Sequence, residues 1–505
     1  MWVVLTALLF LGSKTAYGCT DGEYAPHPSD CNKYLVCNHG AWVEMSCGSG
    51  LYWNAQGKYC DWPASSGCTS GGGQTTTTQR PTSTTTQRLT STTTNTGPTT
   101  TTTYRPPGPS GKKLICYFTD WAWYRTAAGK YSPDDIDPTL CTHIVYSFIL
   151  LDASTSQVKI ADSWADVDNK FYEKVTALRR QGVHVTIAVG GWTDSEGNKY
   201  SQMMNDPGKR GTFVRSVVDF VKKWNFEGVD LDLEYPACWQ GNCDGGPASD
   251  KQGFSALVTE LRQALPAGSI LSAAVSASKG IIPKGCKALN LKFYLKSILI
   301  LNSKGNLSGF LIAAYDVPLL SAKLDWIGVM DYDFHGPWDG MTGHIAPLYY
   351  KSGDKVDYFN VDSSIEVWTS LGADPAKLIV GVPTYGKSFT LSNSANNGLN
   401  APTSGAGNSG RYTNAAGTLA YYEICANSGW TVVQDSEGKM GPYAYSGNQW
   451  VSYDDPAFAR KKVAYLKSKG LGGAMVWSLD FDDFNNQCGG GRYPVINALK
   501  QALNS

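Results

Sequence analysis

The sequence predicts an α/β fold, a (β/α)8 or TIM barrel over residues 111–505, preceded by a small disulfide-rich β module. In the long C-terminal part, strand-like apolar runs alternate with amphipathic, helix-like stretches such as 170–182 and 210–226. No Gly-rich nucleotide loop follows the first run, which argues against an open doubly wound sheet. We expect strands at 113–118, 143–149, 184–190, 228–234, 270–277, 325–333, 378–385 and 472–478.

The first eighteen residues resemble a secretory signal, because an apolar run is followed by the small residues Ala16 and Gly18 before Cys19. The alternative is an N-terminal membrane anchor, but the run is too short to span a bilayer. We therefore expect a secreted, extracellular protein with no membrane partner. The formal net charge is +0, so general electrostatics give no reason to expect nucleic acid as a partner.

Residues 19–68 hold six cysteines with the spacing C-x11-C-x5-C-x9-C-x12-C-x7-C. So short a segment cannot bury a sufficient core, and cysteines in a secreted segment indicate disulfides. Six cysteines allow about fifteen pairings, which the spacing alone leaves open. A zinc site is the weaker alternative because C-x2-C pairs are absent.

Residues 69–110 form a Thr-rich tract with the near-repeat TTTTQRPTSTTTQRLTSTTT. Because it holds almost nothing apolar to bury, we expect a disordered, extended and O-glycosylated linker.

The stretch 388–460 interrupts the alternation and is rich in Gly, Asn, Ser and Tyr. It is too long for a plain loop, so we expect a small inserted α+β subdomain between the seventh and eighth strands.

The candidate chemistry lies in FEGVDLDLEYP, residues 226–236. Alternation along a strand turns Asp230, Asp232 and Glu234 toward the barrel interior and the apolar residues between them toward the helices. The alternative is an amphipathic strand with one solvent-exposed face, but the helical stretches on either side of the strand argue against it. Crowded interior acids do not all ionise easily, so at least one should keep its proton. Glu234, nearest the mouth, is the candidate general acid, tuned by the two aspartates.

Other predicted strand ends carry aromatic and polar residues, and barrel enzymes build their sites at this face. A polar, aromatic-lined cleft with a protonated carboxyl group is what glycoside hydrolysis requires. These residues are Trp121, Trp192, Met330, Tyr332, Asp333, Tyr385 and Trp477.

FEGVDLDLEYP resembles D-G-x-D-x-D-x-E, the signature of the glycoside hydrolase family 18 chitinases. The resemblance covers nearly all of 111–505. It includes CYFTDWAWYR, LCTHIVYSF, VGGWTDSEGNKYS, SDKQGFSALVTELRQAL, MDYDFHGPWDGMTGHIAPLY, GVPTYGKSFTL and GAMVWSLDFDDF, in family order. It implies an endo-type chitinase that cleaves β-1,4 linkages of N-acetylglucosamine without metal or cofactor.

The resemblance also implies a role for each matching residue. Glu234 would protonate the glycosidic oxygen and later activate water, while the substrate's own 2-acetamido group is the nucleophile. Asp232 would orient that group, and Asp230 would bias Asp232. Tyr332 would hydrogen-bond the acetamido group, and Asp333 would support the sugar at subsite −1.

The aromatic residues at the matching positions would contact the sugars directly. Trp477 would form the floor of subsite −1, and Trp121, Trp192 and Trp338 would stack on neighbouring sugars. Met330 and Tyr385 complete the expected substrate-binding set. A catalytically weak or inactive chitin-binding lectin is the alternative, although such relatives typically lose the residue matching Glu234.

Four positions depart from the family pattern: Glu227 replaces Asp, Leu233 replaces Trp, Asp331 replaces Thr and Lys387 replaces Arg. Leu233 faces away from the acids by alternation, so it should affect packing. We expect Asp331 to add a charge near the site and to shift the pH optimum.

The N-terminal cysteine spacing and CDWP resemble the peritrophin-A chitin-binding domain, carbohydrate-binding module family 14. The resemblance implies the disulfides Cys19–Cys37, Cys31–Cys68 and Cys47–Cys60. Tyr34, Trp53 and Trp62 are candidate sugar platforms, or else pack the small core. The expected partners are chitin and its oligosaccharides, bound by a monomer.

Seven cysteines remain in the barrel region. The family pattern implies Cys116–Cys141 and Cys425–Cys488, and Cys238 and Cys243 are close enough to pair locally. Cys286 is left over, in an apolar segment, 286–314, that also holds a glycosylation sequon at Asn306. The segment is either a lid or a translated intron, and we favour the intron because loops beyond ~12–15 residues are uncommon in compact domains. A transcript reading from Gly285 straight to Tyr315 would remove the lid.

Overall fold

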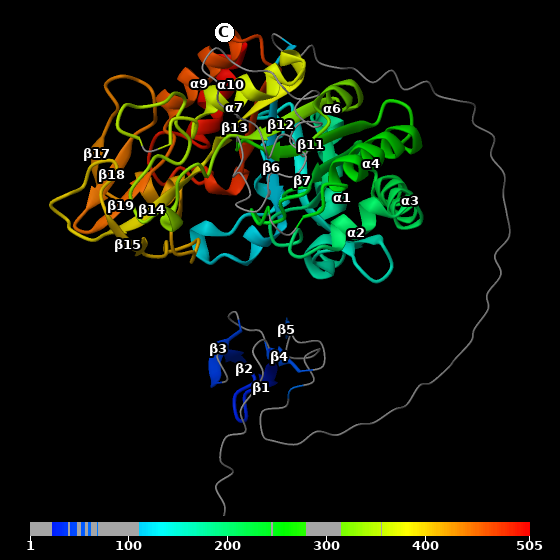
Figure 1. Ribbon diagram of the computed structural model, residues 1–505. Helices are drawn as coiled ribbons and strands as arrows, with labels where there is room; N and C mark the ends of the chain where they lie inside the picture. Colours follow the sequence, from blue (N-terminus) through cyan, green and yellow to red (C-terminus); the bar gives the residue numbers. More distant parts are fainter. Residues whose placement is uncertain are drawn as a thin grey trace, which may run out of the picture. The chain divides into compact units, whose positions relative to one another are not determined.

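The computed structural model describes residues 23–38, 41–47, 52–55, 59–61, 68, 111–243, 246–278, 315–354 and 356–505 (Figure 1). The chain divides into two units, Met1–Thr100 and Thr101–Ser505. The expected signal and linker, Trp62, and the whole segment 286–314 with Cys286 and Asn306 lie outside the described residues.

The larger unit is a closed barrel of parallel strands. The hydrogen-bonded order is β6-β20-β13-β12-β11-β10-β9-β7, pairing of β6 with β7 closes the ring, and β8 (Gln157–Ile160) runs antiparallel beside β7. The predicted barrel is confirmed, with eight strands near their expected ranges. They are β6 (Lys113–Thr119), β7 (His143–Asp152), β9 (His184–Gly190), β10 (Gly228–Asp232), β11 (Ile270–Ser276), β12 (Trp326–Met330), β13 (Leu378–Pro383) and β20 (Gly473–Trp477).

Helices lie outside the barrel strands (Figure 1). α3, for example, begins after Asp206, whose side chain accepts hydrogen bonds from the backbone of Gly208 and Lys209, a standard N-cap. Its apolar face packs into the same core as the apolar residues of β10. The helices are α1 (Phe171–Ala177), α2 (Lys199–Asn205), α3 (Pro207–Trp224), α4 (Asp250–Ala264), α6 (Val317–Lys323), α7 (Val361–Ser370), α9 (Pro456–Ser468) and α10 (Pro494–Asn504). Among the described residues, none of the helices has the length and apolar character needed to cross a membrane.

The expected α+β insertion is present between β13 and β20. Its sheet has the order β15-β14-β19-β18-β17, with β16 paired to β14. The sequence placed Tyr385 at the end of the seventh barrel strand, and this was wrong: β13 ends at Pro383, and Tyr385 begins β14 because it pairs with Ala420 of β16. The elements are β14 (Tyr385–Leu391), β15 (Thr403–Ala406), β16 (Thr418–Ala420), α8 (Tyr421–Cys425), β17 (Thr431–Val433), β18 (Tyr443–Ser446) and β19 (Gln449–Ser452).

The smaller unit is a β module. β1 (Tyr24–Pro26), β2 (Lys33–Asn38) and β3 (Ala41–Ser46) form one antiparallel sheet, and β4 (Tyr52–Asn54) pairs with β5 (Tyr59–Asp61).

Side chains of this module answer part of two questions that the sequence left open, the pairing of the cysteines and the role of the aromatic residues. Cys31–Cys68 is a disulfide, as expected. Cys37 and Cys47 are also disulfide-bonded, but the side chains of their expected partners, Cys19 and Cys60, are not described. The Trp53 side chain is only 4% exposed and its ring stacks on Tyr34, with 4.1 Å between centroids, so core packing is favoured over sugar stacking for Trp53.

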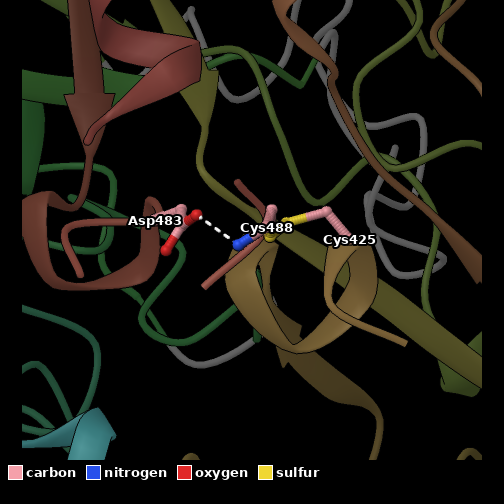
Figure 2. Close-up of side chains that lie close together, drawn as sticks. All are labelled: Cys425, Asp483 and Cys488. Atoms are coloured by element: carbon pink, nitrogen blue, oxygen red, sulfur yellow. Dashed lines mark hydrogen bonds between the residues drawn. A yellow bond between two sulfur atoms is a disulfide. The ribbon is translucent and has the colours of Figure 1, made fainter. Parts of the chain in front are cut away.

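All three disulfides expected in the larger unit are formed: Cys116–Cys141, Cys238–Cys243 and Cys425–Cys488. Figure 2 shows the third beside Asp483, whose carboxylate accepts the Cys488 backbone N–H at 2.9 Å. Cysteine sulfur and carboxylate oxygen are common metal ligands, but the two sulfur atoms here are bonded to each other. The disulfide joins α8 to the loop after β20.

Candidate active site

A cavity of about 510 Å³ opens at the ends of the barrel strands. Its lining comes from the C-terminal parts of β7, β9, β10, β12 and β20, from the segments that follow β6, β8, β9, β10 and β12, and from the start of β14. This is the C-terminal face of the barrel, where barrel enzymes hold their sites. Nine of the residues singled out in the sequence line it: Trp121, Trp192, Asp232, Glu234, Met330, Tyr332, Asp333, Tyr385 and Trp477.

The three acids of the signature form a buried column. Asp230 is 0% exposed, Asp232 3% and Glu234 9%. Asp230 lies deepest and accepts hydrogen bonds from Tyr117 Oη at 2.8 Å and from Ser272 Oγ at 2.5 Å. The intervening apolar residues belong to the core shared with the helices, so the predicted alternation is confirmed.

The pKa values of the column are all raised, for related reasons. Burial raises the pKa of Glu234 to about 8, and the charge of Asp333 adds to the effect. Burial likewise raises the pKa of Asp232 well above its usual range, helped by Glu234 and Asp230. Burial raises the pKa of Asp230 to about 6, although the hydrogen bonds from Ser272 and Tyr117 oppose this. Glu234 therefore holds a proton at neutral pH and can donate it.

The GGW turn after β9 supports the end of β10. Gly190 and Gly191 have φ values of +111° and +85°, and a Cβ atom added at Gly190 would lie 2.2 Å from the carbonyl oxygen of Asp232. That oxygen accepts the Gly191 N–H at 2.7 Å, and Ser195 Oγ accepts the Glu234 N–H at 2.9 Å. Only glycine fits this approach, and the turn fixes the backbone of the candidate acid.

An aromatic wall forms one side of the cavity. The ring of Phe148 stacks against Trp477 with 5.8 Å between centroids and against Trp121 with 5.9 Å. Phe148 was not predicted from the sequence, because strict alternation from the interior residue Val145 points to Ser147. The pairing of β7 with β9 shifts register between Tyr146 and Ile149, and this turns Phe148 inward.

Three polar side chains form a group next to this wall, where Tyr385 and Trp477 belong to one packed cluster. Tyr385 Oη donates to Asp333 Oδ1 at 2.7 Å, and Lys387 Nζ lies 3.3 Å from the same oxygen. Lys387 Nζ also lies 5.5 Å from the ring centroid of Trp338. Trp338 does not line the cavity itself and is 63% exposed.

Asp331 does not line the cavity, although its charge acts on the neighbouring Tyr332. The expected shift of the pH optimum stays a prediction. Asp331 is 0% exposed and its neighbours are Ser364 of α7 and Lys462 of α9. Burial raises its pKa to about 8, against the effects of these two neighbours. Asp331 is therefore mostly protonated at neutral pH and on the outer side of β12.

Glu227 lies at the opposite end of β10 from Glu234. Its carboxylate is 3.1 Å from His184 Nδ1 and 3.3 Å from Arg179 Nε, and it accepts the Val185 N–H at 2.8 Å. It ties the start of β10 to the start of β9, so this irregular residue of the signature has a structural position.

Comparison with protein-family models gives two matches. Residues 113–482 match Glycosyl hydrolases family 18, and residues 18–68 match Chitin binding Peritrophin-A domain.

Known proteins and solved structures agree with these models. Probable chitinase 10 of Drosophila melanogaster is 45% identical over 96% of this chain, which spans only 20% of that protein's length. Catalytic domain 2 of the Ostrinia furnacalis Group II chitinase is 47% identical, with a TM-score of 0.70, over 78% of this chain and 97% of that one. A mutant of that domain is solved in complex with penta-N-acetylchitooctaose. Human YKL-39, described as a pseudo-chitinase with retained chitooligosaccharide binding, is 32% identical, with a TM-score of 0.66, over 78% of this chain and 100% of that one.

Proposed function

Because this chain belongs to the glycosyl hydrolases of family 18, we propose that it is an active chitinase that cleaves β-1,4-N-acetylglucosamine linkages with Glu234 as acid and base. The observation that carries the proposal is the burial of Glu234 at the mouth of an interior acid column, with a pKa raised to about 8. A carboxyl group that is still protonated at neutral pH is the donor that glycosidic cleavage needs.

The remaining groups support a substrate-assisted, retaining reaction. Glu234 donates its proton to the glycosidic oxygen while the acetamido oxygen of the substrate attacks C1. This breaks the glycosidic bond and forms a cyclic oxazolinium ion. Asp232 lies one alternation behind Glu234 and can hydrogen-bond the acetamido group, which orients it for the attack on C1. The Glu234 carboxylate then takes a proton from water, which attacks C1 and restores the acetamido group.

Features of both units support chitin as the substrate. Trp121 and Trp192 present indoles that are 41% and 51% exposed beside the cavity, flat apolar surfaces suited to sugar faces. The chitin-binding module, tethered to the barrel, raises the local concentration of the enzyme on an insoluble polymer. Four described disulfides support secretion, because such bonds persist outside the cytosol.

A chitin-binding protein without turnover is the second candidate, since human YKL-39 is described in that way. The test is Glu234→Gln, which keeps the shape of the side chain and removes its acidity. We expect a loss of kcat on the order of 10²- to 10⁴-fold with oligosaccharide binding retained. Glu227→Gln makes the same change at the other end of β10 and should leave kcat unchanged. A wild-type protein that binds N-acetylglucosamine oligomers but never hydrolyses them between pH 4 and 9 would establish the second candidate.

A further inference from the structure

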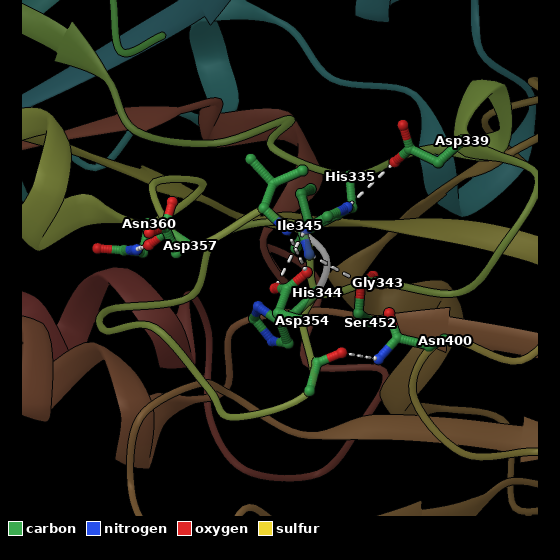
Figure 3. Close-up of polar contacts among 12 residues, drawn as sticks. His335, Asp339, Gly343, His344, Ile345, Asp354, Asp357, Asn360, Asn400 and Ser452 are labelled. Atoms are coloured by element: carbon green, nitrogen blue, oxygen red, sulfur yellow. Dashed lines mark hydrogen bonds and ion pairs between the residues drawn. The ribbon is translucent and has the colours of Figure 1, made fainter. Parts of the chain in front are cut away.

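His335 occupies a nearly closed position in the segment that follows β12. Its side chain is 7% exposed, and both ring nitrogens face carboxylates (Figure 3). Nδ1 lies 3.1 Å from Asp339 Oδ2, and Nε2 lies 3.4 Å from Asp354 Oδ2. Phe359 packs edge-on against the ring at 5.4 Å, and a Cβ atom added at Gly343 would lie 2.4 Å from the His335 ring. These contacts hold the imidazole ring of His335 in one position.

Asp339 uses the same carboxylate oxygen to close a tight turn. Oδ2 also accepts the Gly336 N–H at 3.1 Å, and the Asp339 N–H donates to the Gly336 carbonyl oxygen at 3.0 Å. Trp338 is the middle residue of this turn, and a Cβ atom added at Gly336 would lie 2.3 Å from its ring. The exposed indole thus rests on a turn whose closing carboxylate is held by His335.

The other side of the turn is fixed by the insertion. The Thr403 N–H donates to the Gly340 carbonyl oxygen at 3.0 Å. Asn400, labelled in Figure 3, donates through its Nδ2 to the Gly353 carbonyl oxygen at 2.9 Å. His335 complements these contacts by joining the turn to Asp354, the residue after Gly353. The base of Trp338 therefore has two anchors: the backbone bond from Thr403 to Gly340, and the His335 ring, which joins the turn to Asp354.

Both contacts of the ring require the imidazolium form, because a neutral imidazole has a single N–H. Burial lowers the pKa of His335, but the contacts with Asp339 and Asp354 outweigh this and raise it to about 9. His344 is a second histidine of this segment, and burial lowers its pKa to about 3. His344 is therefore neutral and does not compete for the two carboxylates.

We propose that His335 is a positioning residue for extended substrates. By holding the turn of Asp339 against Asp354, it keeps Trp338 in place as a platform for sugar units beyond those in the lined cavity. The proposal rests on the proposed function in one respect, that the ligand is a chitin-type oligosaccharide. It assigns His335 no contact with the reacting atoms.

Binding should be measured by calorimetry on the full chain in the Glu234→Gln background, where the ligand is not consumed. His335→Gln retains polarity but cannot bridge two carboxylates. We expect Kd for the N-acetylglucosamine hexamer to rise about tenfold, the scale of one lost aromatic contact, and Kd for the dimer to change less than about twofold. Equal weakening of hexamer and dimer would overturn the proposal.

A double-mutant cycle separates positioning from general damage. Trp338→Ala sets the full loss for the hexamer, and adding His335→Gln to it should cause no further loss. Additive losses would show that His335 does not act through Trp338. His344→Gln is the matched control, because His344 is a buried histidine of the same segment whose Nε2 lies 3.2 Å from the Tyr453 carbonyl oxygen. It should lower the midpoint of thermal unfolding without a length-selective loss of affinity.

A second variant keeps the test decisive if His335→Gln does not fold. Asp354→Asn removes only the 3.4 Å ion pair and should give a smaller, still hexamer-selective loss. Unchanged hexamer affinity in folded Asp354→Asn would overturn the proposal. Turnover of the oligosaccharide by the wild-type chain is measured separately. Absence of hydrolysis would contradict the proposed activity but would not affect this binding test.

Discussion

Tyr117→Phe tests whether the ionisation of the acid column sets the rate. Tyr117 is 2% exposed, and its hydroxyl donates to Asp230 Oδ2 at 2.8 Å. A hydrogen bond to a charged group contributes about 1.5–3 kcal/mol, and 1.36 kcal/mol corresponds to one pKa unit. Loss of a donor that stabilises the carboxylate favours the protonated form. The pKa of Asp230, about 6 in the native chain, should therefore rise by roughly one to two units.

The assay is the pH dependence of kcat/KM on an N-acetylglucosamine oligomer between pH 4 and 9. In the proposed mechanism the acidic limb reports ionisation of the Asp230–Asp232 unit, so it should move upward by roughly one to two pH units. The basic limb, set by Glu234, should stay near pH 8. Tyr131→Phe is the control, because it removes a buried hydroxyl that contacts Tyr493 Oη at 2.9 Å on the outer side of the barrel. A folded Tyr117→Phe enzyme with an unmoved acidic limb would refute the role given to Asp230.

Two further predictions concern stability against pH. The contacts with His184 and the Val185 N–H outweigh burial and hold the pKa of Glu227 below its usual value. Glu227→Gln should therefore cost about 1 kcal/mol at pH 7, a difference that fades as pH falls through the lowered pKa; denaturant unfolding that shows the same difference at pH 3 contradicts this. The raised pKa of Asp331 implies the opposite slope, since the folded state favours the protonated acid and loses stability as pH rises toward about 8. Asp331→Asn should raise the thermal midpoint at pH 8, leave it unchanged at pH 4 and not alter kcat; parallel curves for both proteins would contradict it.

The acid column and the barrel could be predicted because they depend on local rules. Alternation along one strand is enough to place Asp230 and Asp232 inside and the neighbouring leucines outside. The same rule applied to Met330 and Tyr332 places Asp331 on the outer side of β12, where the structure has it. The expectation of a charge near the site used the position of Asp331 in the sequence and left this outward direction out of account.

Other features depend on contacts between distant segments. Phe148 enters the cavity through a register shift that strand periodicity does not reveal. Tyr385 belongs to the insertion because of its partner Ala420, thirty-five positions later in the chain. The pairing of His335 with Asp354 joins two loop positions and has no periodic signal at all. Such contacts require the folded chain, since several pairings are compatible with the same local pattern.

The two glutamates of the signature show how surroundings decide function. Glu227 and Glu234 lie at opposite ends of β10, in a single run of alternating residues. Glu227 is beside His184 and Arg179 and accepts a backbone N–H, so it stays ionised and holds two strands together. Glu234 is buried beside other acids. The ammonium group of Lys387 is paired with one of these acids, Asp333. The same residue type is therefore a structural anion at the closed end of the strand and a proton donor at its open end. A cation introduced beside Glu234 should lower its pKa and remove the proton that the proposed reaction requires.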